Sequence, residues 1–327
     1  MANAWHLKSR PEGIPAAENF ELKEIDLPPL GDGVVRVRNQ WLSVDPYMRG
    51  RMNESKSYIP PFQIGAPMDG GAVGEVIESN AEGFAPGDLV SHFAGWRDEA
   101  VLPAKALARL PELDARPEDF LGILGVTGAT AYFGLLDVAD AKRKDVVFVS
   151  AAAGAVGSAV VQIAKAKGMI VIGSAGGKDK CDFVRSLGAD EVIDYKAGPI
   201  LASLLTAAPE GIDVYFDNVG GDHLDAAFAR SRLHARIALC GMIAGYNSRE
   251  PQHFRNVIRM IAMRVTMKGF LYGDYVSRLD EFYRDMGELL ANGVKSHVTV
   301  AQGLESMPEA FLGLFSGANT GKMLVRL

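Results

Sequence analysis

The segment AAAGAVG at residues 151–157 has the spacing of a phosphate-binding turn. A dinucleotide fingerprint needs three small residues. The first permits a tight turn after a strand, the second lets the backbone approach a pyrophosphate, and the third lets the next helix pack close to the strand. Ala152, Gly154 and Gly157 hold these places. Alanine is tolerable at the first place if its backbone angles are ordinary. Because the N–H groups that begin the following helix would face the phosphates, we expect a dinucleotide site rather than a simple packing turn.

The end of the second predicted strand distinguishes the two common dinucleotides. NAD sites usually place Asp or Glu there to bind the ribose 2′-hydroxyl. In this chain Ser174 stands at the end of IVIGS, and the residues that follow include Gly176, Gly177, Lys178 and Lys180. A carboxylate would repel a 2′-phosphate, whereas lysines attract it. The sequence therefore predicts NADP(H); the alternative is that both lysines are solvated residues at a helix start.

Strands and helices alternate from about residue 120 onward, and these elements must position the turn. The predicted strands are VVFVS, IVIGS, EVIDY, GIDVYFDNVG and ARIALCG, and the predicted helices are AVGSAVVQIAKAKG, DKCDFVRSLGA and HLDAAFARSRL. Short apolar runs that alternate with helical periodicity indicate a parallel sheet covered on both faces. We therefore predict an α/β fold with a doubly wound Rossmann sheet.

The first 120 or so residues read as β-rich. Apolar and polar side chains alternate in VVRVRNQWLSV, GAVGEVIESN and DLVSHFAGW, as they do in half-buried strands. The final stretch, from AQGLESMPEAF to GKMLVRL, predicts a helix, a glycine-rich turn and a strand. These patterns predict a second, β-rich domain beside the Rossmann domain.

The composition disfavours several classes of function. The chain has 327 residues, 48% hydrophobic and 23% charged, which is typical of a soluble globular protein with room for two domains. A net charge of −6 gives no reason to expect nucleic acid or an anionic membrane surface as partner. The N-terminus lacks a signal-peptide core, and no apolar run approaches the roughly 20 residues of a spanning helix. The two cysteines, Cys181 and Cys240, fit a reducing, cytoplasmic environment.

Several segments together resemble the medium-chain dehydrogenase/reductase family. The likeness is to its zinc-free branch, which holds prostaglandin reductases, plant double-bond reductases and bacterial curcumin reductases. The likeness covers almost the whole chain. The segments that carry it are specific for this branch together, although none of them is specific alone. The segments are LSVDPYMRGRM (42–52), GVTGATAYFGL (125–135), AAAGAVGS, GADEVIDYK, YFDNVGG, CGMIAGYN and GANTGKMLVRL.

The resemblance implies an architecture. A GroES-like catalytic domain would occupy residues 1–120, a Rossmann NADP-binding domain residues 121–295, and a C-terminal segment, residues 296–327, would return to the catalytic domain. It also implies a homodimer joined through edge strands of the Rossmann sheets. VTMKGFLY, at residues 265–272, is the candidate edge.

The residues do not favour a zinc site, which needs about three Cys, His or carboxylate ligands. Zinc-dependent relatives carry a cysteine near the place of Asp45, and a Gly-His-Glu where this chain has Met68 and Asp69. We therefore expect no metal. Without that Lewis acid, alcohol oxidation is disfavoured. Hydride addition to an activated C=C bond fits, because the carbonyl of the substrate itself accepts the electrons.

The resemblance also implies contacts to the cofactor. The turn residues expected at the pyrophosphate are Gly154, Ala155, Val156 and Gly157. Lys180 and Tyr195 match the 2′-phosphate and ribose positions, and Asn319 is expected to reach the phosphates from the C-terminal segment. The residues expected near the nicotinamide are Thr127, Asn218, Cys240, Gly241, Phe270, Leu271 and Tyr272. Cys240 could instead be a small buried hydrophobe, Phe270 sheet core, and Tyr195 a packing residue.

Two tyrosines are candidates for the chemistry at the substrate carbonyl. Tyr246 follows the strand that ends at Cys240, and Tyr47 lies in SVDPYMR. A phenol can donate a hydrogen bond to an enolate or relay a proton, although either ring could instead be a pocket wall. Some relatives carry a proton-donor tyrosine near the place of Ala262, so water can serve here instead. Arg49 and Arg51 are expected to be solvated rather than to meet an acidic substrate.

The leading functional hypothesis is an NADPH-dependent reductase acting on the C=C bond of α,β-unsaturated aldehydes or ketones. SVDPYMR and AGYN favour it over the second hypothesis, an NADPH:quinone reductase. A third is an NADPH-binding protein with little catalysis. The physiological substrate does not follow from the sequence, because it depends on loops such as GRMNESKSYIPPFQIG.

Overall fold

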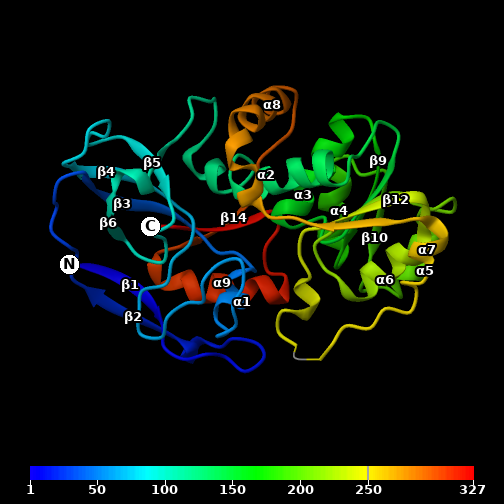
Figure 1. Cartoon of the computed structure of the whole chain (residues 1–327), viewed down its shortest axis with the longest axis horizontal. Helices are drawn as coiled ribbons and strands as arrows, with labels where there is room; N and C mark the ends of the chain where they lie inside the picture. Colours follow the sequence, from blue (N-terminus) through cyan, green and yellow to red (C-terminus); the bar gives the residue numbers. More distant parts are fainter. Residues whose placement is uncertain (249) are drawn as a thin grey trace. The chain divides into compact units, whose positions relative to one another are not determined.

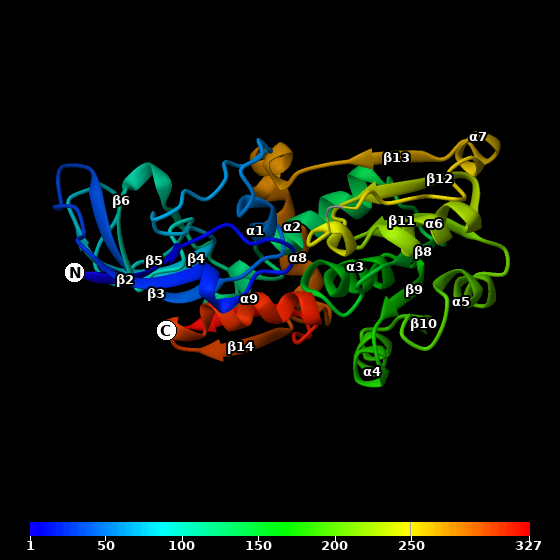
Figure 2. The same cartoon turned by 90° about the horizontal axis from the view of Figure 1, so that it is seen from below.

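The computed structural model describes residues 1–248 and 250–327. It divides the chain into two compact units (Figures 1 and 2). The first unit comprises Met1–Leu121, Val298–Asn319 and Met323–Leu327, and the second comprises Gly122–His297 and Thr320–Lys322. No helix in the described residues is both long and apolar enough to cross a membrane.

The first unit is built on β-sheets. An antiparallel pair, β1 (Ala2–Leu7) and β2 (Phe20–Ile25), accompanies a seven-stranded sheet with the order β14-β15-β3-β4-β5-β7, in which β6 pairs with β3. The strands of that sheet are β3 (Val34–Ser43), β4 (Ala72–Ser79), β5 (Leu89–His92), β6 (Glu99–Pro103), β7 (Ala108–Arg109), β14 (Val298–Gln302) and β15 (Lys322–Arg326). The C-terminal strand β15 thus pairs antiparallel with β3, some 280 residues earlier in the chain.

Alternating burial explains why these strands form. In β3 the side chains of Val35 and Val37 are fully buried at alternate positions and share one apolar cluster. Leu42, beyond a register shift in the strand, is also fully buried but belongs to the main apolar cluster. Two helices, α1 (Met48–Arg51) and α9 (Met307–Ser316), add Met48 and Phe311 to the main apolar cluster. That cluster holds α1 in place and, with it, the neighbouring Tyr47.

The second unit contains a six-stranded parallel sheet with the order β10-β9-β8-β11-β12-β13. Its strands are β8 (Val146–Val149), β9 (Ile170–Ala175), β10 (Glu191–Asp194), β11 (Ile212–Asp217), β12 (Ser231–Leu239) and β13 (Thr266–Gly269). Its helices are α2 (Val126–Phe133), α3 (Ala155–Ala166), α4 (Lys178–Ser186), α5 (Ile200–Ala207), α6 (Gly221–Arg230), α7 (Arg259–Met263) and α8 (Leu279–Ala291).

The sheet is covered on both faces (Figure 2). Helix α2 contacts both α3 and α8, whereas α5 and α6 form a second packed pair. All four residues of β8 are buried, as expected for a strand enclosed from both sides. The predicted doubly wound parallel sheet, with a separate β-rich unit, is therefore confirmed.

One predicted boundary was wrong. The pattern HLDAAFARSRL predicted a helix through Leu233, but α6 ends at Arg230 and β12 already begins at Ser231. Ser231 pairs with Ile212 of β11, and a register shift follows. His234 absorbs the shift with a φ of 63°, a conformation that periodicity does not report.

Candidate active site

The phosphate-binding turn joins β8 to α3. Gly154 is the residue before the first helical turn, and its N–H donates to the carbonyl oxygen of Ala151 at 2.9 Å. The N–H of Ala152 donates to the carbonyl oxygen of Ser174 at 2.9 Å, which ties the turn to β9. Ala152 has no positive φ, as expected. The left-handed residue is Ala151, whose φ of 48° costs roughly 1 kcal/mol for an alanine.

The two glycines of the turn differ in the space available for a Cβ atom. A Cβ atom on Gly157 would collide with the carbonyl oxygen of Ala151 and lie 2.8 Å from the Cα atom of Ala152. A Cβ atom on Gly154 would lie 3.2 Å from the same carbonyl oxygen, which is tight but not prohibitive. Gly157 therefore allows α3 to pack against the turn, while Gly154 keeps the helix end open.

The start of α3 is suited to an anion. Its first turn contains no acidic residue, and in the described part of the chain no side chain caps it. The first N–H groups, at Ala155, Val156 and Gly157, lack helical partners, and the helix dipole adds a partial positive charge. Gly321, with a φ of 69°, donates its N–H to the carbonyl oxygen of Ala153 at 2.8 Å. The C-terminal segment therefore contacts this turn at Gly321. That Asn319 reaches the phosphates stays a prediction.

The end of β9 differs from the prediction. The strand runs one residue further, to Ala175, and Ser174 is fully buried. Its Oγ atom lies 2.9 Å from Nε2 of His223, so it faces inward. Burial lowers the pKa of His223 to about 4, which leaves the ring neutral near pH 7. The first residue after the strand that is not buried is therefore Gly176, which is partly exposed.

Two lysines and a tyrosine gather around Gly176. A Cβ atom at this position would lie 2.6 Å from the Tyr195 hydroxyl and 2.9 Å from Cε of Lys196. Partial burial, and then the charge of Lys196, lower the pKa of Lys180. Neither lysine has an ion pair within residues 1–248 and 250–327. Sequence reasoning chose Lys180 and Tyr195 but missed Lys196, although it directly follows Tyr195.

A pocket of about 550 Å³ lies at the carboxyl ends of β12 and β13. It is lined by Leu239, Cys240, Gly241, Met242, Tyr246, Gly269, Phe270, Leu271 and Asp274. Five of the predicted site residues, Cys240, Gly241, Tyr246, Phe270 and Leu271, are thus brought together. The backbone N–H of Met242 donates to the Tyr246 hydroxyl at 3.4 Å. Burial, and then the charge of Asp217, raise the pKa of the Cys240 thiol to about 12, so it stays protonated.

Three other predicted residues, Thr127, Asn218 and Tyr272, do not line this pocket, and the first two bond to nearby backbone carbonyl groups. Thr127, at the start of α2, donates its hydroxyl to the carbonyl oxygen of Gly122 at 2.9 Å. Asn218 follows β11 and donates its side-chain amide to the carbonyl oxygen of Ser150 at 2.8 Å. Tyr272 begins the short helix η6 (Tyr272–Arg278), and burial raises the pKa of its hydroxyl.

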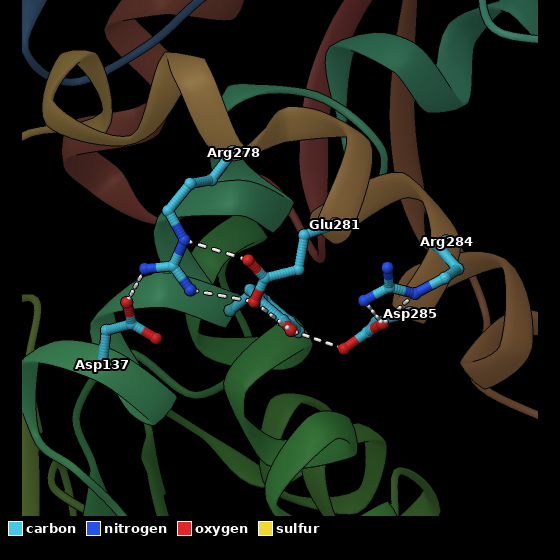
Figure 3. Close-up of polar contacts among 6 residues, drawn as sticks. Asp137, Arg278, Glu281, Arg284 and Asp285 are labelled. Atoms are coloured by element: carbon cyan, nitrogen blue, oxygen red, sulfur yellow. Dashed lines mark hydrogen bonds and ion pairs between the residues drawn. The ribbon is translucent and has the colours of Figure 1, made fainter.

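An ionic network anchors the wall formed by Phe270, Leu271 and Asp274 (Figure 3). Arg278, the last residue of η6, pairs with Asp137 and with both oxygens of Glu281 on α8. Tyr132 of α2 donates its hydroxyl to Asp285 at 2.6 Å. This holds η6 and α8 against α2.

The packing of α2 continues this anchoring. The aromatic ring of Phe133 stacks on Tyr275 with centroids 4.5 Å apart, and the guanidinium of Arg278 lies 5.1 Å from the centre of the same ring. Gly134 begins a one-turn π-helix, and a Cβ atom there would collide with Phe270. Phe270 is therefore fixed from behind by the backbone of Gly134.

In the first unit, Tyr47 lies close to the ion pair of Arg51, which is buried, with Asp69, which is partly exposed. Burial, and then the charge of Asp45, raise the pKa of the Tyr47 hydroxyl, which therefore remains a hydrogen-bond donor. The expectation that Arg49 and Arg51 are solvated was wrong, because both are at least 94% buried. Arg49 donates to the carbonyl oxygen of Gly13 at 2.8 Å.

Arg51 is held by charge and by aromatic contact. It pairs with both oxygens of Asp69, and its guanidinium lies 4.0 Å from the ring centre of Phe62. Periodicity could not predict this burial, because the partner residues lie up to 18 positions away.

Comparisons with known proteins agree with this geometry. Residues 3–110 match the family model described as the N-terminal domain of oxidoreductase, and residues 155–292 match the one described as zinc-binding dehydrogenase. The NADPH-dependent curcumin reductase of Escherichia coli (strain K12) is 40% identical over 99% of this chain and 96% of its own length. The chain belongs to the medium-chain dehydrogenase/reductase family, in the branch that contains the curcumin reductases.

Two further members of this reductase branch are similarly close. The 2-alkenal reductase (NADP(+)-dependent) of Nicotiana tabacum is 41% identical over 98% of this chain and 95% of its own length. The crystal structure of CurA in complex with NADPH from Vibrio vulnificus is 42% identical, with a TM-score of 0.95 and 99% coverage of both chains. The family resemblance identified from the sequence is therefore confirmed.

Met68 and Asp69, which stand where zinc-dependent relatives carry ligands, have other partners in this chain. Met68 is fully buried in the apolar cluster of the first unit, and Asp69 is paired with Arg51. Across the described residues, no three or more His, Cys, Asp or Glu side chains come together in a way that could hold a metal ion.

Proposed function

We propose that this protein is an NADPH-dependent reductase of the C=C bond in α,β-unsaturated aldehydes and ketones. The observation that carries the proposal is full-length identity of about 40% to an NADPH-dependent curcumin reductase and to a 2-alkenal reductase. The supporting geometry is a pocket at the ends of β12 and β13 and, in the same unit, a turn after β8 that is suited to a pyrophosphate.

The residues of the second unit fit NADPH. The turn at Gly154–Gly157 would hold the pyrophosphate, and Lys180, Tyr195 and Lys196 around Gly176 would hold the 2′-phosphate. Asn218, Cys240 and Gly241 would lie toward the nicotinamide. When bound, NADPH supplies the hydride for the reduction.

The protein's own groups would orient the substrate and manage the proton. As a C=C bond conjugated to a carbonyl is reduced, negative charge builds on the carbonyl oxygen, and a hydrogen-bond donor stabilises it. Tyr246 is the donor in the pocket, with Tyr47 as a second candidate. Phe270 and Leu271 supply apolar wall that excludes water.

The test is NADPH oxidation with a medium-chain 2-alkenal, an aromatic enone, a quinone and a saturated aldehyde, with identification of each product. We expect saturation of the C=C bond with the carbonyl retained. Consumption confined to the quinone would favour the NADPH:quinone reductase instead. NADPH binding without turnover on any of the four acceptors would contradict the proposed activity.

We also infer a homodimer formed through β13 and a cytoplasmic location. Strand β13 lies at the edge of the sheet with all four residues exposed, and Ile258, Ile261 and Met267 are exposed apolar side chains near it. Both cysteines are free thiols. Light scattering after size-exclusion chromatography tests the dimer, with Met267→Asp expected to shift it toward monomer. Cell fractionation tests the location.

A further inference from the structure

Asp217 ends β11, the strand between β8 and β12, and its side chain is completely buried. Its Oδ1 atom accepts hydrogen bonds from the Tyr215 hydroxyl at 2.6 Å, from the N–H of Gly220 at 2.8 Å and of Val219 at 2.9 Å, and from the Ser150 hydroxyl at 3.3 Å. One oxygen atom therefore holds the turn after β11 and the residue after β8.

The backbone of the same residue holds the next strand end. The carbonyl oxygen of Asp217 accepts from the N–H of Cys240 at 2.9 Å and of Gly241 at 3.0 Å. Both of those residues line the pocket. Asn218 is fixed by the same group of residues, because its N–H donates to the Ser150 hydroxyl at 2.9 Å. Asp217 thus connects the ends of three adjacent strands.

Burial makes a negative charge on this side chain costly, and the donors around Oδ1 offset part of that cost. Its Oδ2 atom is buried and has no hydrogen-bond partner in the described residues, and burial raises the pKa of the carboxyl group. Oδ1 of Asp217 faces four donors. A carboxylate oxygen and an amide oxygen each offer about two lone pairs, but a carboxylate oxygen carries negative charge and accepts these bonds more strongly, so asparagine should substitute only in part.

We propose that Asp217 is a positioning residue for hydride transfer, which sets Asn218, Cys240 and Gly241 at the nicotinamide side of the pocket. The proposal rests on the proposed NADPH-dependent reduction. The second unit would then have two separate groups of residues. Asp217 would position the residues at the nicotinamide side of the pocket, whereas Lys180 and Lys196 would determine the preference for NADPH over NADH. No residue of the Gly176 group bonds to Asp217.

The test compares Asp217→Ala and Asp217→Asn with a matched control at the other end of the same strand. Both substitutions keep the backbone carbonyl that accepts from Cys240 and Gly241, so they test whether the side-chain bonds to Val219, Gly220 and Ser150 fix the position of that carbonyl. Asp213, near the start of β11, accepts from the N–H of Val146 at 2.9 Å and from Arg232 at 2.7 Å. Asp213→Ala removes comparable hydrogen bonds far along the strand from the pocket residues. We expect it to lower the thermal midpoint but to leave kcat unchanged.

For Asp217→Ala, assayed where circular dichroism shows it folded, we expect kcat to fall at least tenfold. The primary deuterium isotope effect with NADPH deuterated at C4 should rise, because hydride transfer becomes more rate-limiting. The preference for NADPH over NADH should stay within threefold of the wild-type value. For Asp217→Asn, kcat and the isotope effect should lie between those of the wild type and those of Asp217→Ala. If Asp217→Ala does not fold, the same three measurements on Asp217→Asn test the proposal.

Wild-type kcat and isotope effect in a folded Asp217 variant would overturn the proposal. The fluorescence of bound NADPH provides a readout that needs no substrate. A displaced nicotinamide environment should lower this fluorescence in the Asp217 variants and not in Asp213→Ala. If the wild-type protein reduces no enone, the proposed function fails, while unchanged fluorescence in the variants would count against Asp217 alone.

Discussion

The Oγ atom of Ser174 lies 2.9 Å from Nε2 of His223, and both side chains are buried within the second unit. Because burial holds the folded-state pKa of His223 near 4, the folded protein binds a proton at this ring only at a lower pH than the unfolded chain does. The unfolded pKa is about 6.5, so stability is lost as pH falls from about 6.5 toward 4.

We expect His223→Gln to reduce this pH dependence by about 1.4 kcal/mol per pH unit between pH 6 and 5, one proton's worth. Urea unfolding at pH 7, 6 and 5 measures it. His92, whose pKa burial also lowers to about 4, provides an independent comparison in the first unit. Parallel stability curves for wild type and His223→Gln would show that this histidine is not buried as a neutral ring.

The turn glycines should separate stability from cofactor binding. Gly157→Ala forces a Cβ atom against Ala151 and should cost about 1–3 kcal/mol of unfolding free energy. Gly154→Ala has more space and should cost less than about 1 kcal/mol, yet weaken NADPH binding about tenfold because it narrows the approach to the helix end. Unfolding titrations and NADPH fluorescence measure the two effects. Equal losses of stability in both variants would contradict the distinction.

Removing a lysine beside Gly176 should affect NADPH alone. Lys180→Gln and Lys196→Gln should each raise KM for NADPH about tenfold, since each loses a charge-assisted contact to the 2′-phosphate, and leave KM for NADH unchanged. Lys178→Gln is the control, because Lys178 is 85% exposed and pairs with Asp182. An equal change in KM for both cofactors would place these lysines outside the 2′-phosphate site.

Tyr246→Phe keeps the ring in the pocket and removes only the hydroxyl. If the phenol stabilises or protonates the enolate, kcat should fall about tenfold to a hundredfold, with little change in NADPH affinity. Tyr47→Phe tests the second candidate in the same assay. Full turnover in Tyr246→Phe would reduce this residue to a wall of the pocket and leave water as the proton source.

The network around Arg278 should act on the substrate rather than on the cofactor (Figure 3). Arg278→Gln removes the ion pairs with Asp137 and Glu281, which should loosen the wall at Phe270–Asp274. We expect KM for the enone to rise about twofold to fivefold, a small effect because these ion pairs are partly exposed, with KM for NADPH unchanged. Arg284→Gln, on α8 and pairing only with Asp285 among the acidic groups described, is the control.

Features that depend on residues close together in the sequence could be predicted from the sequence alone. The spacing of Ala152, Gly154 and Gly157, the alternation of strands and helices, and the absence of a carboxylate after IVIGS predicted the Rossmann sheet and the NADP(H) preference. These features depend on backbone geometry within one turn or one strand. The same local information failed at Ser231, where pairing with Ile212 outweighed helical periodicity.

The tertiary structure decided which distant side chains meet. Arg51 is buried because Asp69 neutralises it, and Lys196 lies beside Lys180 because parallel strands β9 and β10 end at the same edge. Asp217 reaches Cys240 because their strands are neighbours in the sheet. Strand order and packing determine such contacts, and no periodicity within a single element encodes them, so the turn follows from sequence whereas the groups that position the pocket follow from the fold.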